Sequence, residues 1–525
     1  MTNLRLFFHS LSLSNLLSLP LWATIFAIND QFSRSPGDYL GAALLVLILA
    51  VLFFAVNYIF LRLPLMRSVH LRACLLLMVW GLIALTTVKP FLSTWFPGLA
   101  HYYFTDNLVM IGVLALAILS VAGLAVWRRP QQIVQGLIVV AYLMTPFAFV
   151  TFGKAVSMAF NPLGGGVIRE DPTWSRLPAG VQKPRVVTVL FDEFDFEIGF
   201  PKRPASVEMP EMDRLRKESF FSTQAYAPMH STAKSVPAML TGRLVTDSKH
   251  DEQNPGDKKI EFFDQGQGML SEQESIFSDV RAMGKRSLRM SPAYLPNFRI
   301  AGRFDADTVV PSVLDHPNGV LDGVTEAALI SLSRVMAFFN SVGLEQSIRS
   351  WTQVHPPSGT LTSAIENAVQ LAVHSDADLI YLHLLLPHLP TVYDAENGRF
   401  SDVGLGRQSY LANLSGVDRV FQRMRRAMEE AGRWDSTTVI IKADHYYRRK
   451  RMDMGLSDHR VPLIVKFAGG QPPMEFSHPF NLTLYRSFVA LLMSGQLRNG
   501  QELGAWITQN ATFGESPLTQ YRQGW

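Results

Sequence analysis

The chain has 525 residues, of which 48% are hydrophobic and 18% charged, and its mean hydropathy is +0.13. This composition is too apolar for a chain that is soluble throughout and too charged for one buried wholly in lipid, so we expect a membrane part and a soluble part. The 48 basic and 44 acidic residues give a net charge of only +4, which does not favour a nucleic-acid-binding protein. The single cysteine, Cys74, excludes an intramolecular disulfide and a zinc site of the CxxC type.

Nearly all the long uncharged runs lie in residues 1–153. A helix needs roughly 20 apolar residues to cross the hydrocarbon core of a bilayer. Five segments are predicted as membrane-spanning helices on this basis: 6–27, 39–61, 73–88, 107–127 and 131–153. The first of them follows Arg5 and is diluted by serines, so a cleaved signal peptide is its alternative interpretation. The sequence therefore predicts a five-helix transmembrane domain over residues 1–154.

The short loops between these segments predict the orientation in the membrane. Basic residues concentrate in two of the loops: Arg62, Arg67 and Arg72 in one, and Arg128 and Arg129 in the other. Loops rich in Lys and Arg stay on the cytoplasmic side. With five spans, everything after Lys154 is then expected outside the cytoplasm.

Residues 155–185 are rich in glycine and proline and are predicted to be a linker, followed by a soluble domain over 186–525. Apolar runs at 186–191, 378–386, 437–442 and 461–467 predict buried strands, and 417–431 has a helical pattern. Alternation of strands and helices predicts a doubly wound α/β sheet, whose site lies at the strand ends.

Carboxylates and an imidazole follow two of these predicted strands. Asp192 and Glu193 end the first, and Asp444 and His445 end the third. Such groups bind hard or borderline divalent cations, so the four residues are candidate metal ligands. The alternative interpretation of the acidic pair is a solvated turn or a helix start, which is preferred for Asp195 nearby.

The segment His230 to Arg243 reads H-S-T-A-K-S-V-P-A-M-L-T-G-R, and Ser231 or Thr232 would cap the helix that it begins. This segment resembles the nucleophile helix of the alkaline phosphatase/sulfatase superfamily, which reads C-x-P-S-R-x-x-L-L-T-G-R in sulfatases. The shared L-T-G-R puts Thr232 at the nucleophile, and Val236 where sulfatases keep an arginine.

Threonine cannot become the formylglycine that sulfatases require. It resembles instead the membrane-anchored branch of lipoteichoic acid synthases, phosphoglycerol transferases and phosphoethanolamine transferases. This resemblance implies an alkaline-phosphatase-like α/β catalytic domain behind five transmembrane helices, on the periplasmic side of a bacterial cytoplasmic (inner) membrane. It also implies that Glu193 and Asp192 fall on metal-ligand positions, and that Thr232 is both nucleophile and ligand.

The remaining site residues come from the same comparison. The superfamily reads S-D-H-G or A-D-H-G where this chain has A-D-H-Y, so Tyr446 replaces a glycine. His388 matches a substrate-side histidine, whereas His383 is interpreted as a core residue. His459 is a candidate ligand or phosphate contact, or else a surface histidine. Lys234 would steady the phosphate, with a solvent-facing lysine as the alternative, and the basic run 448–451 is interpreted as a solvated loop.

The implied activity is metal-dependent transfer of a phospho group from a membrane phospholipid to an envelope lipid or glycan, through a phosphothreonine at Thr232. Zinc is preferred because imidazole occurs in the ligand set, with manganese or magnesium as alternatives. Two rival functions remain open at this point: a phosphate or sulfate ester hydrolase of the same superfamily, and a catalytically silent membrane protein that binds lipid or a regulator.

Overall fold

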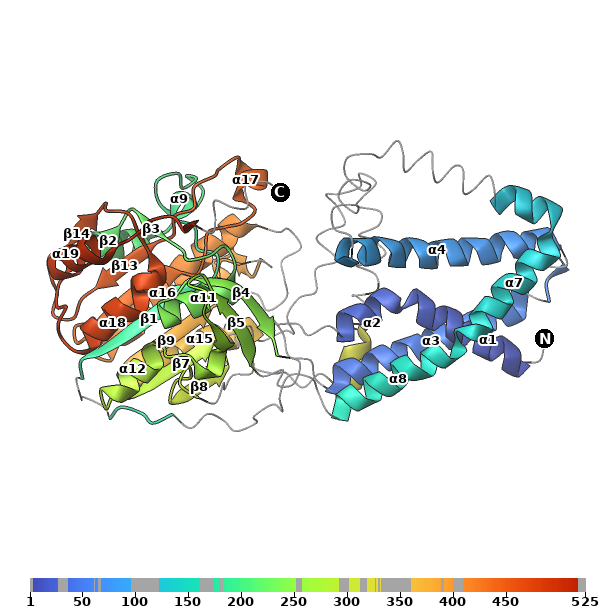
Figure 1. The fold of residues 1–525 in the computed structure, drawn as a ribbon, viewed down its shortest axis with the longest axis horizontal. Coiled ribbons are helices and arrows are strands. Elements are labelled where there is room, and N and C mark those ends of the chain that lie inside the picture. Colours follow the sequence, from blue (N-terminus) through green and yellow to red (C-terminus); the bar gives the residue numbers. More distant parts are fainter. Residues whose placement is uncertain are drawn as a thin grey trace. The chain divides into compact units, whose positions relative to one another are not determined.

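The computed structural model describes residues 3–26, 36–60, 62–64, 68–95, 122–160, 174–178, 181, 183–251, 257–291, 302–311, 319–325, 327–328, 331, 360–388, 391–400 and 409–517 (Figure 1). These residues form two compact units, which are described one at a time. The described residues of 3–160 and 319–331 belong to a helical unit, and those of 174–311 and 360–517 belong to an α/β unit.

The helical unit contains α1 (Asn3–Leu17), α2 (Leu19–Phe26), α3 (Pro36–Phe60), α4 (Val69–Trp95), α7 (Pro130–Leu143) and α8 (Thr145–Phe160). Among the described residues, two helical stretches are long and apolar enough to cross a membrane, Pro36–Phe60 and Pro130–Phe160. The predicted span 6–27 is divided between α1 and α2, and most of the predicted span 107–127 lies outside the described residues. The predicted five-helix bundle is therefore not confirmed.

Polar side chains that dilute the first apolar run join α1 to its neighbours. Ser12 Oγ donates to the carbonyl of Ala141 at 2.6 Å, and Ser14 Oγ donates to that of Val46 at 2.7 Å. Thr151 Oγ1 donates to Asn15 Oδ1 at 2.7 Å. Hydroxyl groups between apolar helices commonly find such partners. These serines therefore serve helix packing.

Two observations describe the extent of the helical unit. Helix α8 ends at Phe160. Ala327 packs with Leu21, Trp22 and Tyr39 in the core of this unit. Gly323, in a helical stretch over 320–325, lies directly against the backbone of α3, which allows this close approach.

The α/β unit is built on an eight-stranded sheet in the order β14-β2-β13-β12-β1-β9-β7-β8 (Figure 1). Its strands are β1 (Arg185–Phe191), β2 (Phe220–Ser222), β7 (Ser287–Ser291), β8 (Thr308–Pro311), β9 (Leu379–Leu384), β12 (Thr437–Ala443), β13 (Leu463–Lys466) and β14 (Met474–Phe476). The four predicted strands are confirmed as β1, β9, β12 and β13. Neighbouring strands β12, β1 and β9 run parallel, and β13 is antiparallel to β12.

Helices and small sheets complete this unit. The helices are α9 (Phe196–Gly199), α10 (Pro210–Lys217), α11 (Thr232–Thr241), α12 (Ile276–Ala282), α15 (Thr360–His374), α16 (Tyr410–Glu430), α17 (Lys450–Met454), α18 (Tyr485–Met493) and α19 (Gly500–Asn510), with short 3-10 turns at Leu270–Glu272 and Leu482–Leu484. The small sheets join β4 (Val245–His250), β5 (Lys258–Phe262) and β6 (Gln267–Met269), β10 (Tyr393–Asp394) and β11 (Arg399–Phe400), and β3 (Ala225–Tyr226) and β15 (Phe480–Asn481). Every residue of β1 is buried, as expected for a central strand covered on both faces.

Candidate metal centre and nucleophile

The carboxyl ends of three parallel strands bring polar side chains together. Asp192 follows β1, Asp444 follows β12, and His383 lies in β9 opposite Leu190. One ligand atom from each of these three residues lies within 4.8 Å of the others, and all three residues are buried. A group of this kind can hold a metal ion. We call Asp192, His383, Asp444 and the adjacent His445 the strand-end cluster.

The carboxylate of Asp192 is the member of the cluster that is best suited to bind a cation. Among the described residues, neither of its oxygens has a hydrogen-bond partner, and His383 Nε2 lies 3.7 Å from Asp192 Oδ2. Burial opposes the charged form, but the imidazoles of His383, His388 and His445 outweigh it and hold the pKa of Asp192 well below its usual range. A buried, ionised carboxylate without hydrogen bonds fits a metal ligand.

Helix α11 begins at Thr232 and carries its hydroxyl to the cluster. Thr232 Oγ1 donates to Asp444 Oδ2 at 2.6 Å and lies 3.2 Å from His445 Nε2. Ser235, one turn further along, donates to the carbonyl of Asp444 at 2.5 Å and so ties the helix to the loop after β12. Segments more than 200 residues apart in sequence therefore meet at the Thr232 hydroxyl.

His445 is oriented by its other ring nitrogen. Its Nδ1 lies 2.9 Å from the carbonyl oxygen of Tyr446, a contact in which only a protonated Nδ1 can donate. The lone pair of Nε2 then faces Thr232 and Asp444, and Asp444 Oδ2 lies 3.4 Å away. A backbone carbonyl commonly orients a metal-binding histidine in this way. Tyr446 does not have a positive φ, so the loop does not require the glycine of the superfamily pattern.

Glu193 lies beside the strand-end cluster in an unusual backbone conformation. Its φ is +65°, a value that few residues other than glycine adopt. The conformation is held by two hydrogen bonds: its amide donates to Asp444 Oδ1 at 3.0 Å, and its carbonyl accepts from Tyr410 Oη at 2.7 Å. Its carboxylate pairs with Arg448 Nε at 2.9 Å. Of the predicted ligands, Glu193 is thus the one already paired with a cation.

The other predicted site residues differ in their distance from the cluster. His388 is adjacent, since its amide donates to the carbonyl of Asp192 at 3.2 Å. The ammonium of Lys234 instead donates to the carbonyl of Thr246 at 2.5 Å, which joins α11 to β4. His459 stacks on Tyr446 at 4.4 Å, and its Nδ1 lies 2.5 Å from a carboxylate oxygen of Glu515. The structure therefore brings His388 to the cluster and gives Lys234 and His459 other partners.

His383 is buried in β9, as its interpretation as a core residue predicts, and it also lies within reach of two carboxylates. The run Y-L-H-L-L-L predicts a buried strand, and a histidine within it reads as a core residue. The parallel register places His383 beside Leu190, two residues before Asp192, which brings its ring to the candidate metal site. The available signal was the position of His383 near the carboxyl end of a strand, but recognising it required knowing that β9 pairs with β1.

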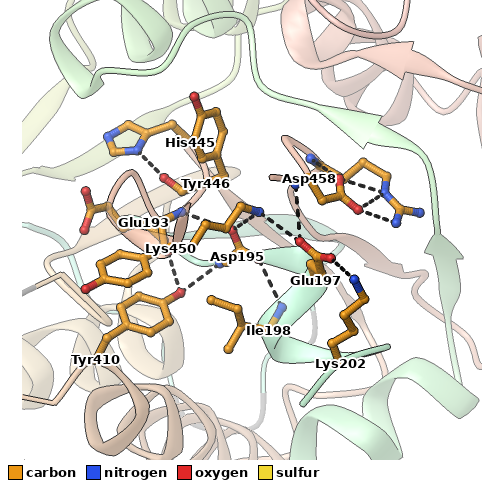
Figure 2. A network of polar contacts seen from close by, with 12 residues as sticks. Glu193, Asp195, Glu197, Ile198, Lys202, Tyr410, His445, Tyr446, Lys450 and Asp458 are labelled. Atoms are coloured by element: carbon orange, nitrogen blue, oxygen red, sulfur yellow. Dashed lines mark hydrogen bonds and ion pairs between the residues drawn. The ribbon is translucent and has the colours of Figure 1, made fainter. Parts of the chain in front are cut away.

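A second group of charged side chains contains Asp195, Glu197 and Lys450, and we call it the Asp195–Lys450 network (Figure 2). Asp195 caps α9 by accepting from the amide of Ile198 at 3.0 Å, and it also accepts from Lys450 Nζ at 2.7 Å and the amide of Tyr447 at 3.2 Å. Lys450 is 2% exposed. The prediction of a helix cap at Asp195 is confirmed, but the prediction of a solvated basic run is wrong at Lys450.

The donor set fits a divalent cation. Asp192, Asp444, His383 and His445 would supply carboxylate oxygens and imidazole nitrogens, a mixture that suits zinc and also accommodates manganese. No residue of the cluster carries sulfur, so the site does not select a soft metal. The geometry supports a divalent metal and does not specify zinc.

Residues 336–488 match the sulfatase family model. No curated protein matches the chain. Similar solved structures include a phosphonate monoester hydrolase of Agrobacterium radiobacter, at 12% identity over 59% of this chain and 74% of that chain, with a TM-score of 0.39. They also include a protein in the alkaline phosphatase superfamily from Vibrio parahaemolyticus, at 14% identity over 62% and 71%, with a TM-score of 0.36.

The family match covers part of the candidate site. It includes His383, Asp444 and His445, whereas Asp192 and Thr232 precede it. The match supports an enzyme of phosphate or sulfate ester chemistry and does not distinguish the membrane-anchored transferases from the hydrolases. The strand-end cluster thus combines residues inside the range that matches this model with Asp192, which lies outside it.

Proposed function

We propose that this protein transfers a phospho group, of the phosphoethanolamine or phosphoglycerol type, from a membrane phospholipid to an envelope lipid or glycan. The observation that carries the proposal is the position of the Thr232 hydroxyl, which contacts Asp444 and His445 beside the buried Asp192. A nucleophile within hydrogen-bond reach of groups that orient it is the arrangement required for covalent catalysis.

The reaction is a double displacement at phosphorus. Asp444 orients the Thr232 hydroxyl through the 2.6 Å hydrogen bond. In the first step the Thr232 hydroxyl gives its proton to Asp444 and its Oγ1 forms a bond to phosphorus, while the bond to the lipid alkoxide breaks and the alkoxide takes a proton from His388. In the second step an acceptor hydroxyl gives its proton to His388 and attacks phosphorus, and the Oγ1–phosphorus bond breaks as Thr232 takes its proton back from Asp444. A divalent cation bound by the strand-end cluster would supply Lewis acidity and favour the ionised threonine.

Threonine supports phosphate over sulfate as the transferred group. Sulfatases rely on formylglycine made from cysteine or serine, as described above for the family pattern, and threonine has a methyl group where that oxidation would occur. The two apolar stretches Pro36–Phe60 and Pro130–Phe160 support attachment to a membrane, where a lipid donor is concentrated. The proposed location is the bacterial cytoplasmic membrane, with the α/β unit on the periplasmic side.

A phosphate ester hydrolase is the second candidate, and the sulfatase family match favours it. The two functions share every step up to the phosphothreonine and differ in whether water or an acceptor hydroxyl attacks it. A silent lipid-binding protein would form no such adduct.

The test uses the full-length chain in its membrane. Wild type and Thr232→Ala are incubated with phospholipid and manganese or zinc, purified, and compared by intact mass and by peptide mapping of α11. The expected result is a phospho adduct on Thr232 in wild type alone, removed by chelation during incubation. An adduct on both proteins, or on neither with every phospholipid class supplied, contradicts the proposal. Release of the group as a free phosphate ester in the presence of envelope lipid and glycan selects the hydrolase.

A further inference from the structure

We propose that Arg448 binds the phospho group of the substrate at the rim of the strand-end cluster. The proposal rests on the phosphate chemistry proposed above, and it assigns a substrate-contacting role to a residue of the basic run 448–451. The sequence assigned the role of binding the phosphate to Lys234, but the ammonium of Lys234 contacts Thr246 and Asp247 instead.

The negative charge of the carboxylates favours a further positive side chain at the site. The strand-end cluster contains the carboxylates of Asp192 and Asp444, whose two charges a divalent cation would compensate. Glu193 lies beside the cluster, with its amide bonded to Asp444 Oδ1, and its carboxylate adds a negative charge that the metal would leave uncompensated. An anionic phosphodiester approaching that site would be repelled. One further positive side chain makes the site neutral before the substrate enters, and a guanidinium also offers several N–H donors to phosphate oxygens.

Other positions where a cation could bind the phosphate do not fill this role. Val236 stands where the sulfatase pattern has its arginine, so α11 lacks that charge. Lys234 donates to the carbonyl of Thr246 and lies 3.6 Å from Asp247 Oδ1, so its ammonium serves β4. Lys450 is buried against Asp195 in the Asp195–Lys450 network. Arg448 and Arg449 of the basic run 448–451 lie in the loop that follows Asp444.

Arg448 lies in that loop with the required geometry. Its Nε donates to Glu193 Oε1 at 2.9 Å, and the Glu193 side chain is 7% exposed whereas that of Arg448 is 47% exposed. The buried carboxylate of Glu193 therefore binds the Nε side of the Arg448 guanidinium, and about half of the Arg448 side chain remains accessible to a ligand. Figure 2 shows the Glu193 carboxylate pointing away from the Lys450 ammonium, so the two ion pairs are separate.

Hydrogen bonds to the backbone of Glu193 hold its side chain in position for this ion pair. Glu193 keeps its positive φ because Asp444 and Tyr410 hold its amide and carbonyl. Holding a residue in a strained conformation is common where a site orients a ligand group. Partial burial lowers the pKa of Arg448, but the carboxylates of Glu193, Asp192 and Asp444 together raise it above its ordinary value. The guanidinium is thus within the electrostatic field of the strand-end cluster.

Inorganic phosphate is the probe, titrated by calorimetry into the full-length chain in detergent after loading with manganese and removal of the excess. Arg448→Gln is compared with Arg449→Gln, a matched control because Arg449 is 42% exposed and pairs with Asp453 on α17. The expected result is a phosphate Kd raised about 10- to 100-fold in Arg448→Gln and unchanged in Arg449→Gln. Arg448→Lys is expected to lie between, because lysine keeps the charge and loses the fork.

The metal Kd of the same variants separates substrate binding from a merely structural role. Arg448→Gln is expected to bind manganese at least as tightly as wild type, because a nearby positive charge is removed. Equal phosphate Kd in both glutamine variants, or loss of metal and phosphate affinity by one common factor, overturns the proposal. Repeating the titration in a Thr232→Ala background distinguishes the two failures, since phosphate binding by Arg448 does not require an adduct on Thr232.

Discussion

Two aspartates on one loop, Asp192 and Asp195, are both completely buried, yet their surroundings differ in kind. Asp195 accepts three hydrogen bonds, including one from the buried ammonium of Lys450. Within the described part of the chain, the oxygens of Asp192 accept none. A buried charge is tolerated when it is paired and hydrogen-bonded. The comparison teaches that Asp195 is satisfied by the protein itself, whereas Asp192 is arranged for a cation from solution.

The largest expected effect comes from removing the carboxylate charge of Asp192, whose oxygens have no hydrogen-bond partner among the described residues. Asp192→Asn should lower metal-dependent activity at least about a thousandfold, because metal-ion catalysis is worth several kcal/mol of transition-state stabilisation. The thermal stabilisation that manganese or zinc gives to wild type should disappear with it. Differential scanning fluorimetry of the full-length chain, with and without metal, checks this. An unchanged metal-induced shift would show that Asp192 is not a ligand.

The next largest effect is expected from removing the cation that pairs with Asp195. Lys450→Met leaves Asp195 buried without its cation and should lower the free energy of unfolding by about 3–5 kcal/mol. The loss should be the same with and without metal. Lys202→Met is the control, because Lys202 pairs with Glu197 at 2.7 Å but is 60% exposed, and such pairs contribute about 1 kcal/mol or less. A loss that metal restores would place Lys450 in the strand-end cluster.

A third buried carboxylate, Asp418, sharpens the comparison through pH. Burial raises its pKa to about 7, although the amide of Met212 donates to it at 2.7 Å. Since the pKa in the unfolded chain is near 3.8, the folded state keeps a proton that the unfolded state releases between about pH 4 and 7. Its contribution to stability therefore falls as pH rises through that window.

Asp418→Asn should remove this fall, because asparagine does not ionise. The stability of the Asp418→Asn variant relative to wild type should thus increase from pH 4 to pH 7. Thermal unfolding at closely spaced pH values measures this difference. Glu208→Gln, a change at a residue whose side chain makes no described contact with Asp418, serves as the control. Parallel pH profiles of wild type and Asp418→Asn would contradict the assignment.

The smallest effect concerns the attachment of the nucleophile helix. Ser235→Ala removes the 2.5 Å hydrogen bond to the carbonyl of Asp444 and should cost about 1 kcal/mol of stability, with a several-fold loss of activity. Thr241→Val removes a hydroxyl-to-carbonyl bond of 2.7 Å within the same helix and should leave the metal response unaltered. Equal losses of activity in the two variants would show that Ser235 has no special role in positioning Asp444.

Several features could be predicted from the sequence because they depend on local pattern. The apolar runs predicted β1, β9, β12 and β13, since a buried parallel strand is continuously apolar. The helix that begins at Thr232, and the convergence of Thr232 with Asp444 and His445, followed from the motif and from the position of those residues at strand ends. The predicted five-helix bundle is not confirmed, because the length of an apolar run does not specify where helices begin and end.

What the sequence determined by itself was which residue types stand at strand ends and helix starts, because these positions depend on local periodicity and capping. Only the tertiary structure decided which of them share an environment. It brought His383 to Asp192 through strand pairing, turned Lys234 to β4, and paired Glu193 with Arg448. The physical reason is that charge compensation inside a protein depends on contacts a few ångströms long between segments far apart in the chain, and sequence spacing does not encode those distances.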